Sequence, residues 1–385
     1  MCALRKAVAD RNSGLRRLAT RLPRQWLYQI GDDGVVFSEE QSRFAGLDAT
    51  AVSAYLAFDA GATPEDLRAC GPHTRSTVSR NTMAAIYALS QGIFPAEDGP
   101  VDWPPLQNAP IANIALHNVP VLIEFPPRPV DELCRDVFRN CPAAAKPAAY
   151  KISAERATTG WAIHINGGEI LSSLADEQLG LGFLHAARSV LYAASRYDVA
   201  FHAAMVGTEN CGIMLSAPRE AGKSTLSAYL LSHGFDLLAD EPTLLQLDTG
   251  CVSSLSLPIS LKRKSWTVLR NDWPTLEQAP IHVRSDGTKI RLLHPPSASR
   301  STISRRLTRI VFPEYPPSGA ACIEQISPLQ ALRLANDAGM VLARYFSRSK
   351  FEAFLELLCT IPAYRLRYAS LSEAFSSISR LVNEA

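Results

Sequence analysis

Residues 211–243 read CGIMLSAPREAGKSTLSAYLLSHGFDLLADEPT, and the fold expected for the chain follows from them. Residues 212–216 are apolar and rich in β-forming side chains, which predicts a buried strand. Beyond residue 225, apolar side chains recur at helical spacing. A strand, a loop and a helix in this order are the setting in which phosphate-binding loops occur.

The nine residues between this strand and the body of the helix form the predicted phosphate loop: Ala217, Pro218, Arg219, Glu220, Ala221, Gly222, Lys223, Ser224 and Thr225. Backbone N–H groups of such a loop surround the anion, and the helix N-terminus adds partial positive charge. We expect Lys223 to contact the β- and γ-phosphates of ATP and Ser224 to bind Mg²⁺. The first position, usually glycine, is Ala217. A glycine turn with a chance lysine is the alternative, and the flanking strand and helix favour the loop.

A second strand is predicted over residues 235–239, and it ends in Asp240 and Glu241. Two adjacent carboxylates beside a phosphate loop can divide two tasks. One can hold Mg²⁺ together with Ser224, while the other accepts the proton of an attacking hydroxyl. A solvated turn is the alternative interpretation of the pair.

Three segments together resemble HPr kinase and its relatives: FHAAMV at residues 201–206, the GKST loop, and HGFDLLADE at residues 233–241. The resemblance implies an α/β fold over residues 111–385, a P-loop kinase domain with a mixed sheet similar to that of phosphoenolpyruvate carboxykinase. It also implies ATP-dependent phosphorylation of a hydroxyl group on a protein or peptide. By position, His202 matches the histidine that assists the catalytic aspartate, Asp240 the general base and Glu241 the metal-side acid. The glycine-rich second signature of HPr kinases with phosphorylase activity is not found. The runs LPISLKRKS and VFPEYPPSG resemble HPr-kinase-related proteins from peptide and exopolysaccharide gene clusters.

Two further side chains are candidates for the chemistry. His202, in a strand preceding the loop, is expected to reach Asp240, and a histidine–carboxylate pair can tune a base. Lys262 lies in PISLKRKS, which places three cations beside the expected substrate cleft. There it would stabilise negative charge on the transferred phosphoryl group. A solvated basic turn is equally compatible with this run.

Four segments are predicted along the chain: a basic tail at 1–23, a small winged-helix-like α+β domain at 24–95, a Pro-rich linker at 96–110 and the kinase domain at 111–385. The small domain is expected to have three strands with a turn at 32–34, then helices at 50–58, 63–67 and 76–93. This order resembles the peptide chaperone of pyrroloquinoline quinone biosynthesis and elements that bind leader peptides. The resemblance implies a leader added as a strand at an open edge near residues 35–37. An accessory or dimerisation domain is the alternative.

The composition and net charge argue against some classes of binding partner. The net charge is +2, which gives no strong field for nucleic acid or an anionic membrane. Eight scattered cysteines without a CxxC motif suit a reducing compartment, and no run is long and apolar enough to span a bilayer or serve as a signal peptide. We therefore expect a cytoplasmic protein, with its homo-oligomeric state left open.

The function expected from these patterns is transfer of the γ-phosphoryl group of ATP to a Ser or Thr hydroxyl of a peptide or small protein. A ribosomally made precursor peptide held by its leader is the expected substrate. Two alternatives remain open at this point: a nucleotide-gated peptide-binding module without transfer, and a kinase for a small molecule or sugar.

Overall fold

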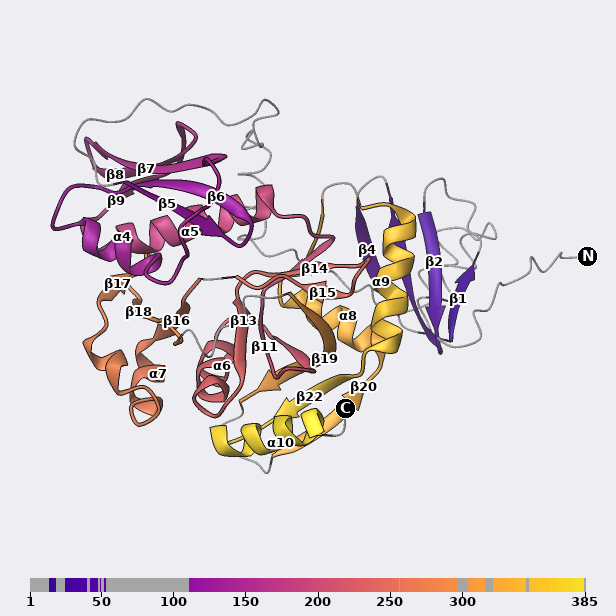
Figure 1. Ribbon diagram of the computed structural model, residues 1–385. Coiled ribbons are helices and arrows are strands. Elements are labelled where there is room, and N and C mark those ends of the chain that lie inside the picture. Colours follow the sequence, from indigo (N-terminus) through magenta and orange to yellow (C-terminus); the bar gives the residue numbers. More distant parts are fainter. Residues whose placement is uncertain are drawn as a thin grey trace, which may run out of the picture.

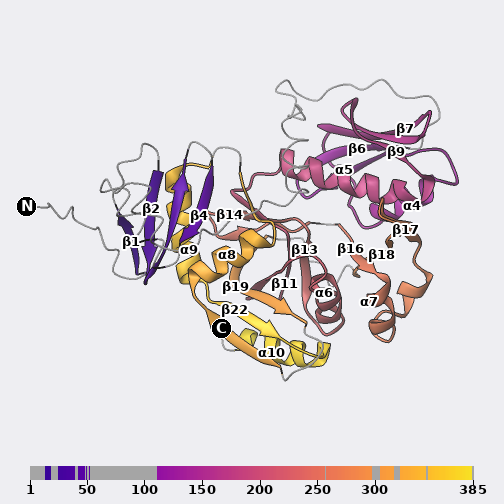
Figure 2. The same cartoon turned by 180° about the vertical axis from the view of Figure 1, so that it is seen from behind.

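The computed structural model describes residues 14–18, 25–39, 42–47, 49, 52, 111–255, 257–296, 304–315, 321–343 and 346–383. Within these residues the chain is an α/β structure with four sheets, two of them mixed (Figure 1; Figure 2). The helices predicted at 50–58, 63–67 and 76–93, and the linker at 96–110, lie outside the described residues and stay predictions.

The largest sheet has ten strands and contains the strand that leads into the predicted phosphate loop. Along its main path the order is β13 (Asp236–Asp240), β11 (Ala203–Gly207), β12 (Gly212–Ser216), β19 (Arg305–Glu314), β15 (Cys251–Val252), β14 (Thr243–Gln246), β10 (Val199–Phe201) and β21 (Val341–Leu342). β22 (Ala363–Arg367) joins β19, and β20 (Cys322–Ile326) joins β22. Every residue of β11 and β12 is buried, which explains why both read as continuous apolar runs.

Both faces of this sheet are covered, because alternate residues of its strands enter two separate cores. Ala204 and Ile213 pack with α6 (Lys223–Ser232) and α10 (Leu371–Asn383). Met205 and Met214 belong to the other core, which includes side chains of α8 (Pro328–Asp337) and α9 (Arg348–Thr360). Figure 1 shows α6 beside α10, and α8 beside α9. α8 ends at Asp337, and the chain then forms β21.

A five-stranded sheet lies before the loop in sequence, and it is mixed, because β6 and β7 pair in parallel while its other pairs are antiparallel. Its order is β5 (Ile111–Leu116), β6 (Val119–Glu124), β7 (Tyr150–Ala157), β8 (Gly160–Ile165) and β9 (Gly168–Leu174). β8 and β9 are joined by a turn at Asn166 and Gly167, and both residues have positive φ, as a tight hairpin turn requires. The helices α4 (Asp131–Val137) and α5 (Leu179–Ala194) follow β6 and β9, and the one-turn η1 (Asp176–Gln178) leads into α5. Both α4 and η1 contact α5, and α5 also lies against β7, β8 and β9 of this sheet.

A three-stranded sheet connects these two parts. It consists of β16 (Ile259–Lys262), β18 (Lys289–Leu293) and β17 (Ile281–Val283), with the short helices α7 (Arg263–Val268) and η2 (Pro274–Gln278). The fully buried His282 of β17 lies 2.9 Å from Asp136 of α4, Nε2 to Oδ2. This contact holds the small sheet against the helices of the five-stranded sheet.

The N-terminal sheet differs from the expectation in three ways. Residues 15–18, placed in a tail by sequence, form β1 (Leu15–Leu18) beside β2 (Gln25–Ile30). The turn to β3 (Asp33–Ser38) is at residues 31–32, because Gly31 adopts φ +64, so the hairpin turns one residue earlier than predicted. β3 is paired on its other side with β4 (Arg43–Leu47). Residues 35–37 therefore lie inside the sheet, and the edge strands among the described residues are β1 and β4.

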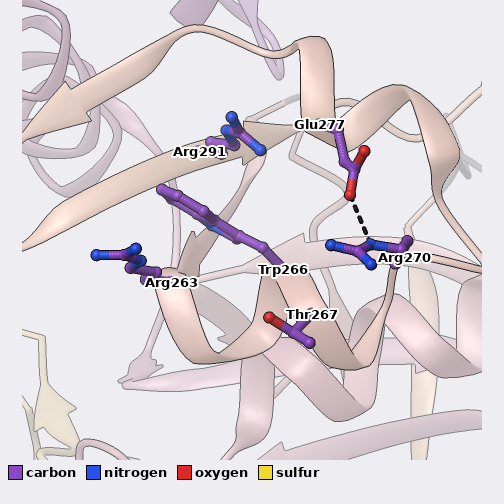
Figure 3. Close-up of a pocket in the computed structure, with 6 residues that line it drawn as sticks. All are labelled: Arg263, Trp266, Thr267, Arg270, Glu277 and Arg291. Atoms are coloured by element: carbon purple, nitrogen blue, oxygen red, sulfur yellow. Dashed lines mark hydrogen bonds and ion pairs between the residues drawn. The ribbon is translucent and has the colours of Figure 1, made fainter.

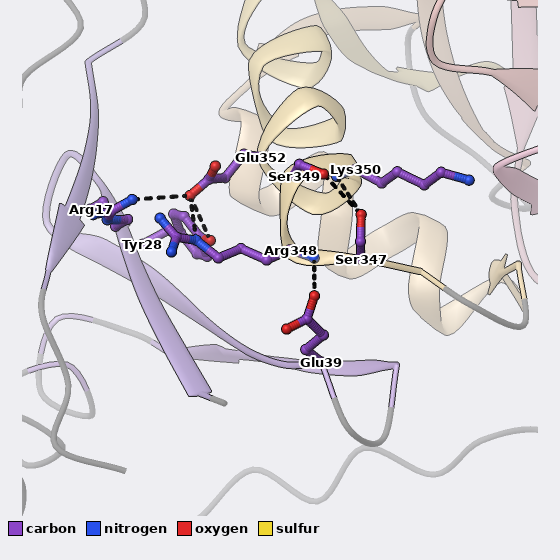
Figure 4. A network of polar contacts seen from close by, with 8 residues as sticks. All are labelled: Arg17, Tyr28, Glu39, Ser347, Arg348, Ser349, Lys350 and Glu352. Atoms are coloured by element: carbon purple, nitrogen blue, oxygen red, sulfur yellow. Dashed lines mark hydrogen bonds and ion pairs between the residues drawn. The ribbon is translucent and has the colours of Figure 1, made fainter. Parts of the chain in front are cut away.

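One face of this sheet packs on α9, more than 300 residues away in sequence. Phe37 stacks on Phe351 with ring centroids 4.3 Å apart, and the Tyr28 hydroxyl donates to Glu352 at 3.0 Å. Figure 4 shows the polar rim of this contact, in which Arg17 and Glu39 also face α9. The sheet thus shares a core with the C-terminal helices. None of the helices in the described part of the chain combines the length and apolar character that a membrane crossing needs.

Candidate functional site

The sheet topology brings three of the predicted site residues to one edge. β11 runs antiparallel to both of its neighbours, so β12 and β13 are parallel and end at the same edge. In the register, Ala203 faces Ser216 on one side and Ala204 faces Asp240 on the other. The loop after Ser216, the acid Asp240 and His202 just before β11 therefore meet. Ligands commonly bind at the carboxyl ends of parallel strands.

His202 does not lie in a strand, contrary to the expectation. It occupies the bend between β10 and β11. At this bend the chain leaves its pairing with β14 and joins β12 and β13. The sequence gives no sign of this break. Both short strands are fully buried, so residues 199–206 are apolar apart from His202 and resemble one continuous strand.

The loop turns into α6 at a glycine with a left-handed conformation. Gly222 caps α6 with φ +85, and a Cβ there would lie 3.3 Å from the Tyr368 hydroxyl, so both conformation and space favour glycine. Pro218, Arg219 and Glu220 are exposed, whereas Ala217 is buried and Ala221 is half-buried. The loop therefore presents its outer side to solvent.

Lys223 is the first residue of α6, and its side chain is buried over the loop. The ammonium donates to the carbonyl oxygens of Ala217 at 2.5 Å and Pro218 at 3.2 Å. Burial lowers the pKa of Lys223, and the charges of Glu241 and Asp240 oppose that change. The cation is thus held between the loop and the acid pair, where a phosphate group would contact it.

Asp240 is a buried carboxyl with the properties of a proton acceptor. Its side chain is 5% exposed and accepts a hydrogen bond from the backbone N–H of Ser260. Burial, followed by the neighbouring charge of Glu241, raises the pKa of Asp240 to about 6, although Arg188 and Lys223 act in the opposite direction. A base with a pKa close to neutral combines a substantial ionised fraction with useful basicity.

Glu241 differs from its neighbour in both conformation and ionisation. It adopts φ +43, a left-handed conformation that is unfavourable for a residue with a side chain. Burial alone would raise the pKa of Glu241, but Arg188, the bond to His202 and Lys223 outweigh it, so the pKa lies well below its ordinary value. Glu241 is therefore the ionised member of the pair near neutral pH.

His202 contacts Glu241 and not Asp240, which corrects the expected pairing. Its Nδ1 lies 2.9 Å from Oε1 of Glu241. The reason is local: the Glu241 N–H donates to the carbonyl of Ala203 at 3.1 Å, which fixes Glu241 beside the residue that follows His202. His202 thus orients the ionised acid, and the hydrogen bond to Asp240 comes from Ser260.

Arg188 of α5 is a site residue that the sequence reasoning missed. Its charge lowers the pKa of both Asp240 and Glu241, so it lies close to the acid pair. Two of its buried nitrogens, Nε and Nη2, have no hydrogen-bond partner in the described part of the structure. The only signal in the sequence was a cation in a helix whose other inward side chains are mostly apolar.

Lys262 and Thr225 connect the three-stranded sheet to the loop. Lys262 Nζ lies 2.6 Å from Oε1 of Glu220, and Thr225 Oγ1 lies 2.7 Å from Oγ of Ser265 on α7. Glu220 itself has φ +71, so the ion pair meets a loop residue in a strained conformation. The structure therefore places Lys262 beside the loop, with its charge engaged by Glu220.

The predicted magnesium ligands fit the ion by their chemistry. Ser224, the second residue of α6, is half-buried, and the Glu241 side chain is 37% exposed. A hydroxyl and a carboxylate are hard oxygen ligands, which Mg²⁺ prefers. Among the described residues no group of three or more His, Cys, Asp or Glu could hold a metal ion by itself. Magnesium in phosphoryl-transfer sites commonly has one or two carboxylate ligands and completes its shell with phosphates and water.

Comparison with protein-family models finds no match, and comparison with curated proteins finds no similar protein. One sheet edge holds a loop with inward-facing cation, a buried carboxyl with raised pKa, an ionised carboxylate and an arginine with free donors. Such an edge can bind a polyphosphate and remove a proton beside it.

Proposed function

We propose that the protein is a P-loop kinase of the HPr kinase and phosphoenolpyruvate carboxykinase type, which transfers the γ-phosphoryl group of ATP to a Ser or Thr hydroxyl of a peptide. The observation that carries the proposal is the meeting of Lys223, Asp240 and Glu241 at one sheet edge. A further support is the mixed pairing of β12, which has an antiparallel neighbour on one side and a parallel one on the other.

In the proposed reaction, Lys223 leaves the carbonyls of Ala217 and Pro218 to bind the β- and γ-phosphates. Asp240 accepts the proton of the acceptor hydroxyl. The hydroxyl oxygen bonds to the γ-phosphorus while the bond from that phosphorus to the β–γ bridging oxygen breaks, and ADP leaves. Arg188 and Lys262 would stabilise the charge that develops. Ser224 and Glu241 would hold Mg²⁺, which supplies charge neutralisation on the phosphate oxygens, and His202 keeps Glu241 in position.

The N-terminal sheet is the proposed element for holding the peptide. An extended leader segment would add to an edge strand through backbone hydrogen bonds. Because β3 is paired on both sides, that edge is β1 or β4. The proposal places the reaction in the cytoplasm, where ATP and a newly made precursor peptide are both present.

The test uses the full chain, γ-labelled ATP, Mg²⁺ and the short peptides encoded beside its gene. Labelled phosphoserine or phosphothreonine in a peptide, lost in Asp240→Asn, is the expected result. Tight, nucleotide-dependent peptide binding without transfer would make the protein a binding module. Label found only in small metabolites would make it a small-molecule kinase.

A further inference from the structure

The three-stranded sheet beside the loop carries an excess of positive charge. Residues 259–293 contain seven lysines and arginines against three acidic residues, a net formal charge of +4, whereas the whole chain has +2. Lys262 and Ser265 bind the loop residues Glu220 and Thr225, so this charge lies against the proposed phosphate site. A basic surface at this place favours an acidic substrate.

An open hollow of about 280 Å³ lies between strand β18 of this sheet and the segment of α7 and η2, and it is lined by Arg263, Trp266, Thr267, Arg270, Glu277 and Arg291. Figure 3 shows that Arg270 turns toward Glu277, and the two side chains are 2.6 Å apart. Glu277, the one acid among the described residues that line the hollow, is therefore neutralised by one arginine. Arg263 and Arg291 form no ion pair with the described residues, which leaves two guanidinium groups for a ligand.

Contacts with Trp266 fix the position of the Arg291 side chain in the hollow. Its guanidinium lies 4.3 Å from the centre of the Trp266 ring, and the Trp266 indole donates to the carbonyl of Leu261 at 2.8 Å. Leu261 faces Arg291 across the β16–β18 pair, so ring and guanidinium are fixed by one stretch of sheet. The buried Nε of Arg291 has no hydrogen-bond partner in the described structure. A buried donor without an acceptor is costly, and a ligand carboxylate would supply the acceptor.

We propose that this hollow binds acidic side chains of the peptide acceptor, next to the hydroxyl that is phosphorylated. Arg263 of the hollow directly follows Lys262, whose ammonium contacts Glu220 of the loop. A short segment of the peptide can therefore reach both the hollow and the proposed phosphate site. Guanidinium groups bind carboxylates with two parallel hydrogen bonds, which suits Asp or Glu side chains. The inference rests on the proposed kinase function and adds the substrate class, an acidic peptide.

The experiment compares two synthetic peptides that carry the same acceptor serine, one flanked by glutamates and one by glutamines. With the wild-type full chain we expect the glutamate peptide to have a KM at least about ten-fold lower, from one guanidinium–carboxylate contact. Arg291→Gln and Arg263→Gln should remove that preference and leave the KM for ATP unchanged. Lys289→Gln is the matched control, because Lys289 lies on the same strand as Arg291 but does not line the hollow.

A direct measurement of peptide binding tests the acidic-peptide site even if the protein proves not to be a kinase. Peptide affinity is measured by anisotropy of a labelled peptide, with circular dichroism to confirm folding. Arg263 is exposed, so its variant tests the hollow even where Arg291→Gln disturbs the packing on Trp266. A glutamate preference in binding that both variants abolish supports the site even without transfer. Equal binding of the two peptides, or variants that raise the KM for ATP instead, would overturn it.

Discussion

Replacing Asp240 with asparagine should make the protein more stable at pH 8 and inactive. The folded protein raises the pKa of Asp240 from 3.8 to about 6, chiefly through burial, so folding favours the neutral carboxyl. The stability that this preference contributes is complete below about pH 4 and is lost as the pH rises through 6. The difference between the two pKa values corresponds to about 3 kcal/mol at pH 8. Asparagine is neutral at every pH and avoids this loss.

The assay is urea unfolding of wild type and Asp240→Asn at pH 5, 6.5 and 8, followed by tryptophan fluorescence. We expect the variant to exceed the wild type by up to about 3 kcal/mol at pH 8, with the difference shrinking towards pH 5. Transfer by the wild type should rise with pH through about 6, as Asp240 becomes ionised, and the variant should show none. A variant that is less stable than the wild type at pH 8, or a difference independent of pH, would refute the reasoning.

Four further outcomes test other parts of the structure. Lys223→Ala should weaken ATP binding at least about ten-fold in a titration while circular dichroism stays unchanged, and normal affinity would exclude the loop from nucleotide binding. Glu241→Gln should raise the Mg²⁺ concentration needed for half-maximal transfer; mild and equal effects from both acid variants would mean that the pair is a solvated turn. Arg188→Gln removes a charge that lowers the pKa of both acids, so the acid limb of the rate–pH profile should move to higher pH, and an unmoved limb would place Arg188 outside the site. Phe351→Ala leaves a cavity at a fully buried position and should lower the free energy of unfolding by about 3 to 5 kcal/mol. Hydrogen exchange should then quicken in β2 and β3 more than in β12, whereas a uniform change would argue against a separate docking contact.

The segments that were predicted well are those whose structure depends on near neighbours. The strand predicted at 212–216 is β12, and the helix after it begins at Lys223, because apolar periodicity and Gly222 both act over a few residues. The acid pair also ends its strand as expected, at Asp240. Local pattern was therefore sufficient to find the loop and the acids.

The contacts that were missed join distant parts of the chain. The partner of His202 depends on the register between β11 and β13, and the place of Arg188 depends on how α5 packs near the sheet edge. Neither is encoded in spacing along the sequence. The small domain predicted at 24–95 was expected to be joined to the kinase domain only by a linker, and the packing of the N-terminal sheet on α9 could not be read from either segment alone. Because of this packing, we expect the two fragments of a chain cut near residue 103 to stay associated.

The stacking of Phe37 on Phe351 also constrains the order in which the protein can be made. Roughly 310 residues separate the two rings, and a ribosome adding about 5 to 20 residues per second needs on the order of 15 to 60 s to cover that distance. Throughout that interval the apolar face formed by Tyr28, Val35 and Phe37 has no α9 to cover it. The N-terminal strands are thus synthesised first but are covered only after one of the last helices has been made. We expect a nascent chain stalled before residue 351 to bind chaperones that recognise exposed β-strands.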